Sequence, residues 1–297
     1  MDWLESIRKS IDYMEAHLLT LQGAKEVADA VYLSHFYLQK GFRVMTGYSC
    51  AEYIRNRRLY LAALDIVAGR EKLIDLAFKY GYETPESFSR AFARFHGATP
   101  VQVRAHPDRI RVFLPLKIKV DIQGGNEMDY CVEERKGFRV IGYERKFGFE
   151  DAHGEIPGFW DEICAQKMAN VCAGKEPQSE EEEVIRSCGI GKYGVCIEDA
   201  GKTEFRYMIA GDYHGGKVPE GMTVYEFPEL TWARFRCTGP MPEAIQAVNT
   251  KIFSQWLPGN PEWEIAFPGN VEWYSENGDT QAADYESEIW IPVRRKL

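Results

Sequence analysis

The sequence predicts two domains, an all-α domain followed by an α+β domain. Its 297 residues exceed the usual size of one domain and suit two. In the first hundred residues, apolar side chains recur at helical steps of three and four, whereas later aromatic and β-branched runs are separated by turn residues, as in strands. The charge divides in the same way: residues 1–107 carry 14 Lys and Arg against 12 Asp and Glu, and residues 127–297 carry 18 against 31. We place the domains at 1–107 and 127–297, with a linker at 108–126.

Composition and motif spacing exclude several classes of protein. A chain with 45% hydrophobic and 27% charged residues is globular. No apolar run approaches the roughly 20 residues of a membrane-spanning helix, and the first ten residues lack the apolar core of a secretory signal. The seven cysteines form no CxxC pair and the six histidines no i,i+4 pair. We therefore expect a cytoplasmic protein with reduced thiols, no metal site, no cofactor and no membrane partner.

Glycines punctuate the helices expected in the first domain. Gly23, Gly47, Gly69, Gly81 and Gly97 each follow a segment with helical apolar spacing. The expected helices cover residues 4–18, 24–30, 34–44, 51–68, 72–79 and 85–95, with a short closing helix after Pro100. Six or seven helices joined by short loops make a compact all-α domain.

Two helix-turn-helix units are visible in this domain, and the clearer one spans residues 73–93. Ala77 is small enough for two helices to cross closely, and Gly81 permits the positive φ of a tight turn. Thr84 is suited to cap the following helix, on which Phe88 and Phe92 would be buried. The outward residues of that helix are Pro85, Glu86, Ser89 and Arg90.

The other unit spans residues 25–42. Ala28 is its small crossing residue, Ser34 its expected N-cap, and Leu38 and Phe42 its expected buried pair, while Phe36, Gln39 and Lys40 are expected to face outward. Either unit alone could be a plain hairpin of a helical bundle. Two copies joined by a rod of about 27 Å at residues 51–68 are more specific, because recognition helices about 34 Å apart meet successive major grooves of DNA.

Residues 25–104 resemble the DNA-binding domain of the AraC/XylS family of bacterial transcription regulators. The resemblance lies in GYSCAEYIRNRRL at 47–59 and in DLAFKYGYETPESFSRAFARFHGATPVQVR at 75–104. It implies binding to double-stranded promoter DNA, with RNA polymerase as a further partner. The DNA contacts that it implies are Phe36, Gln39, Lys40, Glu86, Ser87 and Arg90. Four residues depart from the family pattern. Gly41 lies inside the first recognition helix, where glycine lowers helix stability by up to about 1 kcal/mol relative to Ala. Tyr32 stands where a turn glycine is common, and Pro85 and Glu86 stand where hydrogen-bond donors often read bases.

The second domain is expected to repeat a β-α-β-β unit. Two helices are predicted at residues 156–172 and 242–257, and the acidic run Glu180–Glu183 is predicted as a solvated loop. The strands are predicted at residues 130–135, 139–146, 193–197, 204–210, 222–227, 231–238, 271–275 and 286–292. Two such units side by side would form one antiparallel sheet with both helices on one face and a cleft between the halves.

A carboxylate among aromatic residues suggests a cation site in this domain. Glu288 precedes the apolar run Ile289–Ile291 of the last strand and shares a strand face with Glu286 and Trp290. A buried carboxylate needs a partner, which could be a bound organic cation or an arginine, unless the side chain is at the strand end in water. The aromatic residues could form a cage for a cation or could simply fill the core.

This domain resembles the gyrase-inhibitor-like (GyrI-like) effector-binding domain of multidrug-sensing regulators. The matching stretches include CVEERKGFRVIGYERKF at 131–147, the segment 225–258 and EIWIPV at 288–293. The resemblance implies that Glu288 lies at the floor of an aromatic pocket for cationic, lipophilic compounds. The aromatic residues assigned to that pocket are Trp160, Tyr193, Tyr207, Trp232, Trp256, Tyr274 and Trp290.

The leading hypothesis is therefore a transcription regulator that senses a small molecule and needs no catalytic residue. One alternative is a hydrolase in which Glu288 acts as general base beside Tyr193 or Tyr207. Another is a protein-interaction module, which an exposed apolar patch would favour. GIGKYG at 189–194 has the spacing of a dinucleotide fingerprint but lacks the strand-then-helix context that this motif needs.

Overall fold

The structure is a computed structural model of the chain, and it forms two compact units. It describes residues 3–118, 128–149, 152–198, 204–276 and 278–296. The sheet unit consists of Met1–Trp3, Ser34–Met45 and Ile122–Leu297, and the helical unit consists of Leu4–Leu33 and Thr46–Asp121. Segment 34–45, which we predicted in the first domain, is thus grouped with the sheet.

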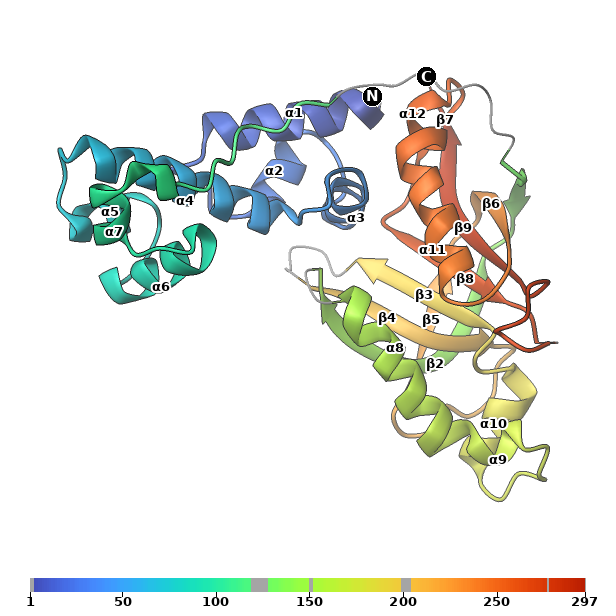
Figure 1. Cartoon of the computed structure of the whole chain (residues 1–297). Coiled ribbons are helices and arrows are strands. Elements are labelled where there is room, and N and C mark those ends of the chain that lie inside the picture. Colours follow the sequence, from blue (N-terminus) through green and yellow to red (C-terminus); the bar gives the residue numbers. More distant parts are fainter. Residues whose placement is uncertain (1–2, 119–127, 150–151, 199–203, 277, 297) are drawn as a thin grey trace. The chain divides into compact units, whose positions relative to one another are not determined.

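The helices predicted in the first hundred residues are all present, with ends within two residues of the expected positions. Figure 1 shows them in blue and green. They are α1 (Trp3–Ala16), α2 (Ala24–Ala30), α3 (His35–Thr46), α4 (Cys50–Ala68), α5 (Leu73–Lys79), α6 (Pro85–His96) and α7 (Pro100–Ala105). Among the described residues, none of the helices is both long and apolar enough to cross a membrane.

Local capping chemistry explains where the helices of the helical unit begin. Ser49 caps α4 in a reciprocal capping box with Glu52, and Thr84 accepts a hydrogen bond from the Ser87 amide at the start of α6. Gly81 has a φ of 83° in the turn before α6, as the sequence predicted. These residues set the ends of α4 and α6 before any tertiary contact is considered.

A single apolar core holds α4, α5, α6 and α7 of the helical unit together. It contains Leu59, Leu76, Phe88 and Phe92, each at most 1% exposed, which confirms the predicted buried face of α6. Phe113, from the predicted linker, packs against this core. The described part of the linker, residues 108–118, contains one 3₁₀ turn at Pro107–Arg109 and no strand.

The sheet unit contains a nine-stranded antiparallel sheet in the described residues (Figure 1). The spatial order is β1-β6-β9-β8-β3-β4-β2-β5, and the short β7 pairs with β9. The strands are β1 (Tyr130–Arg135), β2 (Phe138–Gly148), β3 (Tyr193–Glu198), β4 (Glu204–Asp212), β5 (Met222–Phe227), β6 (Leu230–Thr238), β7 (Trp263–Ile265), β8 (Gly269–Tyr274) and β9 (Glu286–Arg295). All eight predicted strands are therefore confirmed, and β7 was missed.

The duplicated β-α-β-β architecture is confirmed by the order of the elements. One copy runs from β2 through α8 (Ala152–Ile163) to β3 and β4, and the other from β6 through α11 (Glu243–Lys251) to β8 and β9. The helix of each copy continues into a π-helical turn, Cys164–Met168 after α8 and Ile252–Trp256 after α11. The central strands β3 and β8 pair with each other, so the two copies meet there.

The prediction of a loop at the acidic run was wrong. Glu180–Glu183 form the first turn of α10 (Glu180–Cys188), which Ser179 caps by accepting a hydrogen bond from the Glu182 amide. Carboxylates in a first helical turn interact favourably with the positive end of the helix dipole. The run therefore stabilises a helix start, although it lacks the apolar spacing by which we predicted helices.

The two faces of the sheet carry different side chains. Alternation along paired strands places Cys196, Tyr207, Glu272 and Tyr274 on one face, here called the helix face. Both long helices pack on it: Trp160 of α8 donates a hydrogen bond to Tyr207, and Trp256 contacts Phe235 edge-on. On the opposite face, here called the core face, lie Tyr193, Trp232, Glu288 and Trp290.

Candidate functional site

Glu272 is the carboxylate at the centre of an aromatic cluster on the helix face. Its Oε2 accepts hydrogen bonds from the hydroxyls of Tyr274 at 2.8 Å and Tyr207 at 3.1 Å. Trp160 donates its indole N–H to the Tyr207 hydroxyl at 3.0 Å, and its ring meets the Tyr274 ring edge-on at 5.3 Å. Elements from both copies of the duplicated unit therefore build this cluster, here called the Glu272 cluster: Trp160, Tyr207, Glu272 and Tyr274.

The tyrosines of the Glu272 cluster act as hydrogen-bond donors. Burial, together with the negative charge of Glu272, raises the pKa of Tyr207 and of Tyr274 well above the ordinary value of a phenol. Both hydroxyls therefore keep their protons at neutral pH and donate hydrogen bonds to the carboxylate.

Gly194 on β3 is required for this arrangement. It is paired with Glu272 across the sheet. A Cβ atom at Gly194 would overlap the Tyr207 hydroxyl and lie 2.9 Å from Glu272 Oε2. The absence of a side chain at Gly194 lets the phenol and the carboxylate meet above the strand.

Glu288, the carboxylate that we predicted for the effector, lies on the core face and has an arginine partner. Both of its oxygens accept hydrogen bonds from Arg234, at 2.9 and 3.0 Å, and Trp290 donates its indole N–H to Oε2. Arg234 also pairs with Glu133 and lies 4.9 Å from the Trp290 ring centroid. Of the partners considered for a buried Glu288, the structure shows the arginine.

The predicted pocket aromatics separate into three groups. Trp160, Tyr207 and Tyr274 converge on Glu272. Trp256 packs between the rings of Tyr130 and Phe235 on the helix face. The remaining three belong to the apolar core on the core face: Tyr193, Trp232 and Trp290.

Sequence reasoning missed Glu272, although a signal for it exists. In the strand segment VEWY at 271–274, a period of two places Glu272 and Tyr274 on one face. The same period places Glu288 and Trp290 on one face of the last strand, so the pattern alone does not choose between the two carboxylates.

The second recognition helix, α6, presents its expected residues to solvent. Glu86 and Arg90 are exposed, and Pro85 and Ser89 are half-buried. The Ser87 hydroxyl donates to the Thr84 carbonyl at 2.8 Å, so this side chain also takes part in the N-terminal cap. The α6 surface is therefore available to DNA in this structure.

The prediction that Phe36, Gln39 and Lys40 face outward on α3 was wrong for this structure. Phe36 and Gln39 are 2% and 9% exposed, and Lys40 is half-buried. The reason is packing within the sheet unit: a further face of α3 lies against the sheet, where the Phe36 ring meets the Phe205 ring at 5.6 Å. Amphipathic spacing alone reveals only one buried side of such a helix.

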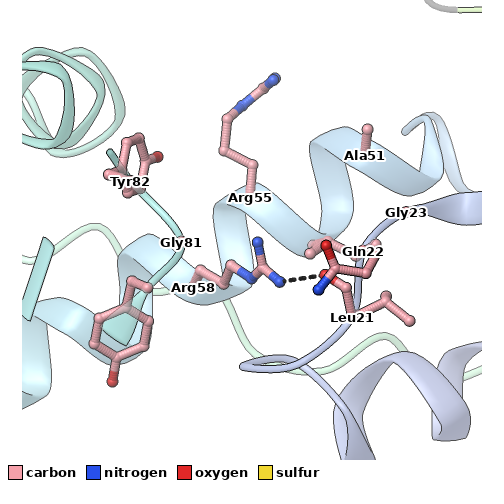
Figure 2. A pocket seen from close by; sticks show the side chains of 10 residues that line it. Leu21, Gln22, Gly23, Ala51, Arg55, Arg58, Gly81 and Tyr82 are labelled. Carbon is pink, nitrogen blue, oxygen red and sulfur yellow. Dashed lines mark hydrogen bonds between the residues drawn. The ribbon is translucent and has the colours of Figure 1, made fainter. Parts of the chain in front are cut away.

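The helical unit has a separate hollow of about 250 Å³ beside α4 (Figure 2). Arg58 closes one side by donating to the carbonyls of Leu18 and Leu21, and Arg55 is exposed at its edge. The lining residues are Leu21, Gln22, Gly23, Ala51, Ile54, Arg55, Arg58, Tyr80, Gly81 and Tyr82. None of them belongs to the Glu272 cluster. Among the described residues, no group of three or more His, Cys, Asp or Glu side chains is arranged to hold a metal ion.

Two family comparisons match the two parts of the chain. The family described as integron-associated effector binding protein matches residues 132–293, and a helix-turn-helix domain family matches residues 27–106. The structure of SAV2435 bound to tetraphenylphosphonium is similar over 56% of this chain and 94% of that chain, at 22% identity and a TM-score of 0.45.

Curated relatives each match part of the chain. Regulatory protein SoxS of Salmonella typhimurium is 34% identical over 104 residues, which are 35% of this chain and 97% of SoxS. The HTH-type transcriptional regulator YbfP of Bacillus subtilis is 29% identical over 174 residues, 57% of this chain and 55% of YbfP. The chain spans 37% of the right origin-binding protein of Escherichia coli. The chain belongs to the family of integron-associated effector binding proteins, and with its AraC-type DNA-binding domain it is a ligand-sensing transcription regulator.

Proposed function

We propose that this regulator senses a cationic, lipophilic small molecule and that Glu272 is the carboxylate that recognises it. The observation that carries the proposal is the set of neutral partners around Glu272: two phenol hydroxyls on one oxygen, and no ion pair among the described residues. An ionised carboxylate without a cationic partner favours the binding of a cation, and the flanking rings of Trp160 and Tyr274 add cation–π attraction.

Glu288 is the less suitable carboxylate for this role. Its side chain is 13% exposed, and its charge is already compensated by Arg234. A ligand cation would have to displace a two-pronged arginine pair, which is among the stronger side-chain interactions in proteins. Charge compensation therefore favours Glu272 over Glu288 as the recognition residue.

Calorimetric titration of the full chain with tetraphenylphosphonium tests the assignment. We expect Glu272→Gln, which keeps the size of the side chain, to weaken binding by about tenfold or more, corresponding to about 1.4 kcal/mol. Glu288→Gln is the matched control and should bind the cation as wild type does. Triphenylphosphine oxide, a neutral compound with similar rings, should bind more weakly than the cation. The assignment is wrong if Glu288→Gln loses binding and Glu272→Gln retains it.

On the DNA side, Glu86, Ser87 and Arg90 of α6 are the proposed promoter contacts in one major groove, with Phe36, Gln39 and Lys40 of α3 in the next. RNA polymerase is a proposed further partner at the promoter. Arg90→Ala should weaken binding to a duplex selected by the wild-type chain. Arg186→Ala, an exposed arginine of the sheet unit, should leave that binding unchanged.

The proposed function does not include catalysis. The alternative of a hydrolase is supported by one observation, the hydrogen bond between Glu272 and Tyr207, which resembles a general base beside a phenol. However, the raised pKa of Tyr207 keeps this phenol protonated, so its hydroxyl donates to Glu272 and occupies a lone pair that the carboxylate would need as a base. Prolonged incubation with a bound ester or amide ligand should therefore leave the ligand intact, and product formation that Glu272→Gln abolishes would establish the hydrolase instead.

A further inference from the structure

Helix α3 lies at the centre of the sheet, where the two copies of the duplicated unit meet. The Tyr37 hydroxyl donates to the Gly269 carbonyl at 2.6 Å, and the Phe36 amide donates to the Glu198 carboxylate at 3.3 Å. Lys40 donates to Asn270 Oδ1 at 3.1 Å. Gly269 and Asn270 begin β8, and Glu198 ends β3. Residues 36–40 of α3, little more than one helical turn, are thus hydrogen-bonded to the two central strands.

The residues that α3 buries against the sheet include those proposed to contact DNA. Phe36 contacts the rings of Phe149 and Phe205, and Tyr37, which is 1% exposed, contacts Phe253. A recognition helix must present such residues to the base edges of a major groove. Seating of α3 on the sheet and insertion of α3 into DNA are therefore mutually exclusive.

Trp3 fits against the unusual glycine of α3. A Cβ atom at Gly41 would overlap the Trp3 ring, and the Trp3 indole N–H donates to the Phe253 carbonyl at 3.0 Å. The glycine that weakens the isolated helix is thus the residue that allows the seated position. This accounts for Gly41, which departs from the pattern of DNA-binding helices.

Lys40 has the surroundings of a bound cation. Its ammonium lies 5.6 Å from the Phe36 ring centroid and 5.8 Å from that of Phe253, within the range of cation–π attraction. Its acceptor, Asn270, is fully buried, and the Asn270 Nδ2 atom has no hydrogen-bond partner among the described residues. Asn270 precedes Glu272 by two residues on the same strand face, so their Cα atoms are about 7 Å apart.

We propose that Lys40 is a built-in competitor of the effector, so that α3 covers the effector site when no ligand is bound and is released when a cation binds. This inference rests on the proposed function of Glu272. Two cations so close to one carboxylate repel each other, and a bulky aromatic cation at the Glu272 cluster would compete with α3 for the helix face. Release would expose Phe36, Gln39 and Lys40 to DNA. By linkage, DNA that engages α3 would raise the affinity for the cation by the same factor.

Hydrogen exchange measured by mass spectrometry on the full chain tests the release. Saturating tetraphenylphosphonium should make the amides of α3 exchange at least about tenfold faster and leave α6 unchanged. Triphenylphosphine oxide should have a smaller effect. If calorimetry shows binding that depends on Glu272 and α3 exchange stays the same, the competition is wrong while the site assignment stands. If the cation does not bind at all, both proposals are wrong.

Removal of the competing charge is a second test. Lys40→Ala should raise the affinity for tetraphenylphosphonium by about tenfold if α3 is seated for about nine-tenths of the time, because the apparent affinity scales with the open fraction. Lys25→Ala is the matched control, since Lys25 lies on the exposed surface of α2 in an i,i+4 pair with Asp29. An unchanged or lower affinity of the Lys40→Ala variant would overturn the proposal.

Discussion

Arg234 on β6 holds Glu288 on β9 by two hydrogen bonds of 2.9 and 3.0 Å, on the face of the sheet opposite to Glu272. The pair is structural, because Glu133 and the Trp290 indole complete its hydrogen bonding. Glu288→Gln should therefore lower the free energy of unfolding. Loss of one partner from a fully buried pair costs about 3–5 kcal/mol, and we expect about 1–2 kcal/mol here because the Arg234 side chain is 28% exposed.

Equilibrium urea unfolding of the wild type and the Glu288→Gln variant measures this loss. Glu144→Gln, which removes one partner of a pair with Arg206 in the same sheet, offers a comparison at similar exposure. A Glu288→Gln variant that unfolds with the wild-type midpoint would show that the pair contributes nothing to stability.

Gly194→Ala should disturb the Glu272 cluster and weaken effector binding. The added methyl group would overlap the Tyr207 hydroxyl, so the strand or the phenol must shift, at about 1–3 kcal/mol. We expect weaker binding of tetraphenylphosphonium in calorimetry together with a lower melting temperature. Gly158→Ala on α8 is the control: nothing lies within 4 Å of its new Cβ, so it should preserve binding and stabilise the helix by up to about 1 kcal/mol.

Gly41→Ala should displace α3 from the sheet through a steric clash. A methyl group at this position would overlap the Trp3 ring, and the same change favours the free helix by up to about 1 kcal/mol. Faster amide exchange of α3 without any ligand is the expected result. In a double-mutant cycle, Gly41→Ala should perturb α3 less in a Trp3→Ala background. Equal effects in both backgrounds would contradict the contact between Trp3 and Gly41.

The cysteines should differ strongly in reactivity. Burial raises the pKa of Cys50, Cys196 and Cys237 to about 12, so almost none of these thiols is ionised at pH 8. Cys131, Cys164 and Cys172 are exposed. Iodoacetamide at pH 8 followed by peptide mass spectrometry should modify the exposed thiols first, and rapid modification of Cys196 in the ligand-free chain would contradict the covered helix face.

His96 should make the helical unit less stable in mild acid. Its Nδ1 accepts the Arg111 amide and its Nε2 faces the Leu59 carbonyl, both at 3.1 Å, and burial lowers the pKa of the imidazole. The unfolded chain takes up a proton at the ordinary pKa of about 6.5, whereas the folded chain does so only at lower pH. The contribution to stability is therefore intact above pH 6.5 and falls as the pH drops below it. Amide exchange of α6 should accelerate between pH 7 and 5.5 more in the wild type than in His96→Gln, after correction for the intrinsic pH dependence of exchange.

Local signals in the sequence were enough to predict most of the fold. Gly81, Thr84 and the pair Phe88 and Phe92 define α6 by turn, cap and burial, and each has the predicted role. The run Glu180–Glu183 was misjudged because its helix begins with charge rather than with an apolar period. The short strand β7 has only three residues, too few for a period-two pattern to be recognised.

The candidate site was harder to predict because it depends on the pairing of distant strands. Glu272 and Tyr207 are 65 residues apart in the chain and meet only through the register of β8, β3 and β4. Glu288 shows the same alternation as Glu272, and the two carboxylates are distinguished by their partners on other strands, Arg234 for Glu288 and Tyr207 for Glu272. The burial of Phe36 likewise requires knowledge of a sheet that begins some ninety residues later.

A crystal structure of the full chain with tetraphenylarsonium tests the central claim most directly. The arsenic atom scatters anomalously and locates the cation without reference to the shape of the ligand. The account predicts arsenic on the helix face within about 6 Å of the Glu272 carboxylate, the range of a cation in contact with such a cluster. The hydrogen bond between Lys40 and Asn270 should then be broken. Arsenic beside Glu288 on the core face, with Arg234 displaced and α3 still seated, would contradict both the site and the competition.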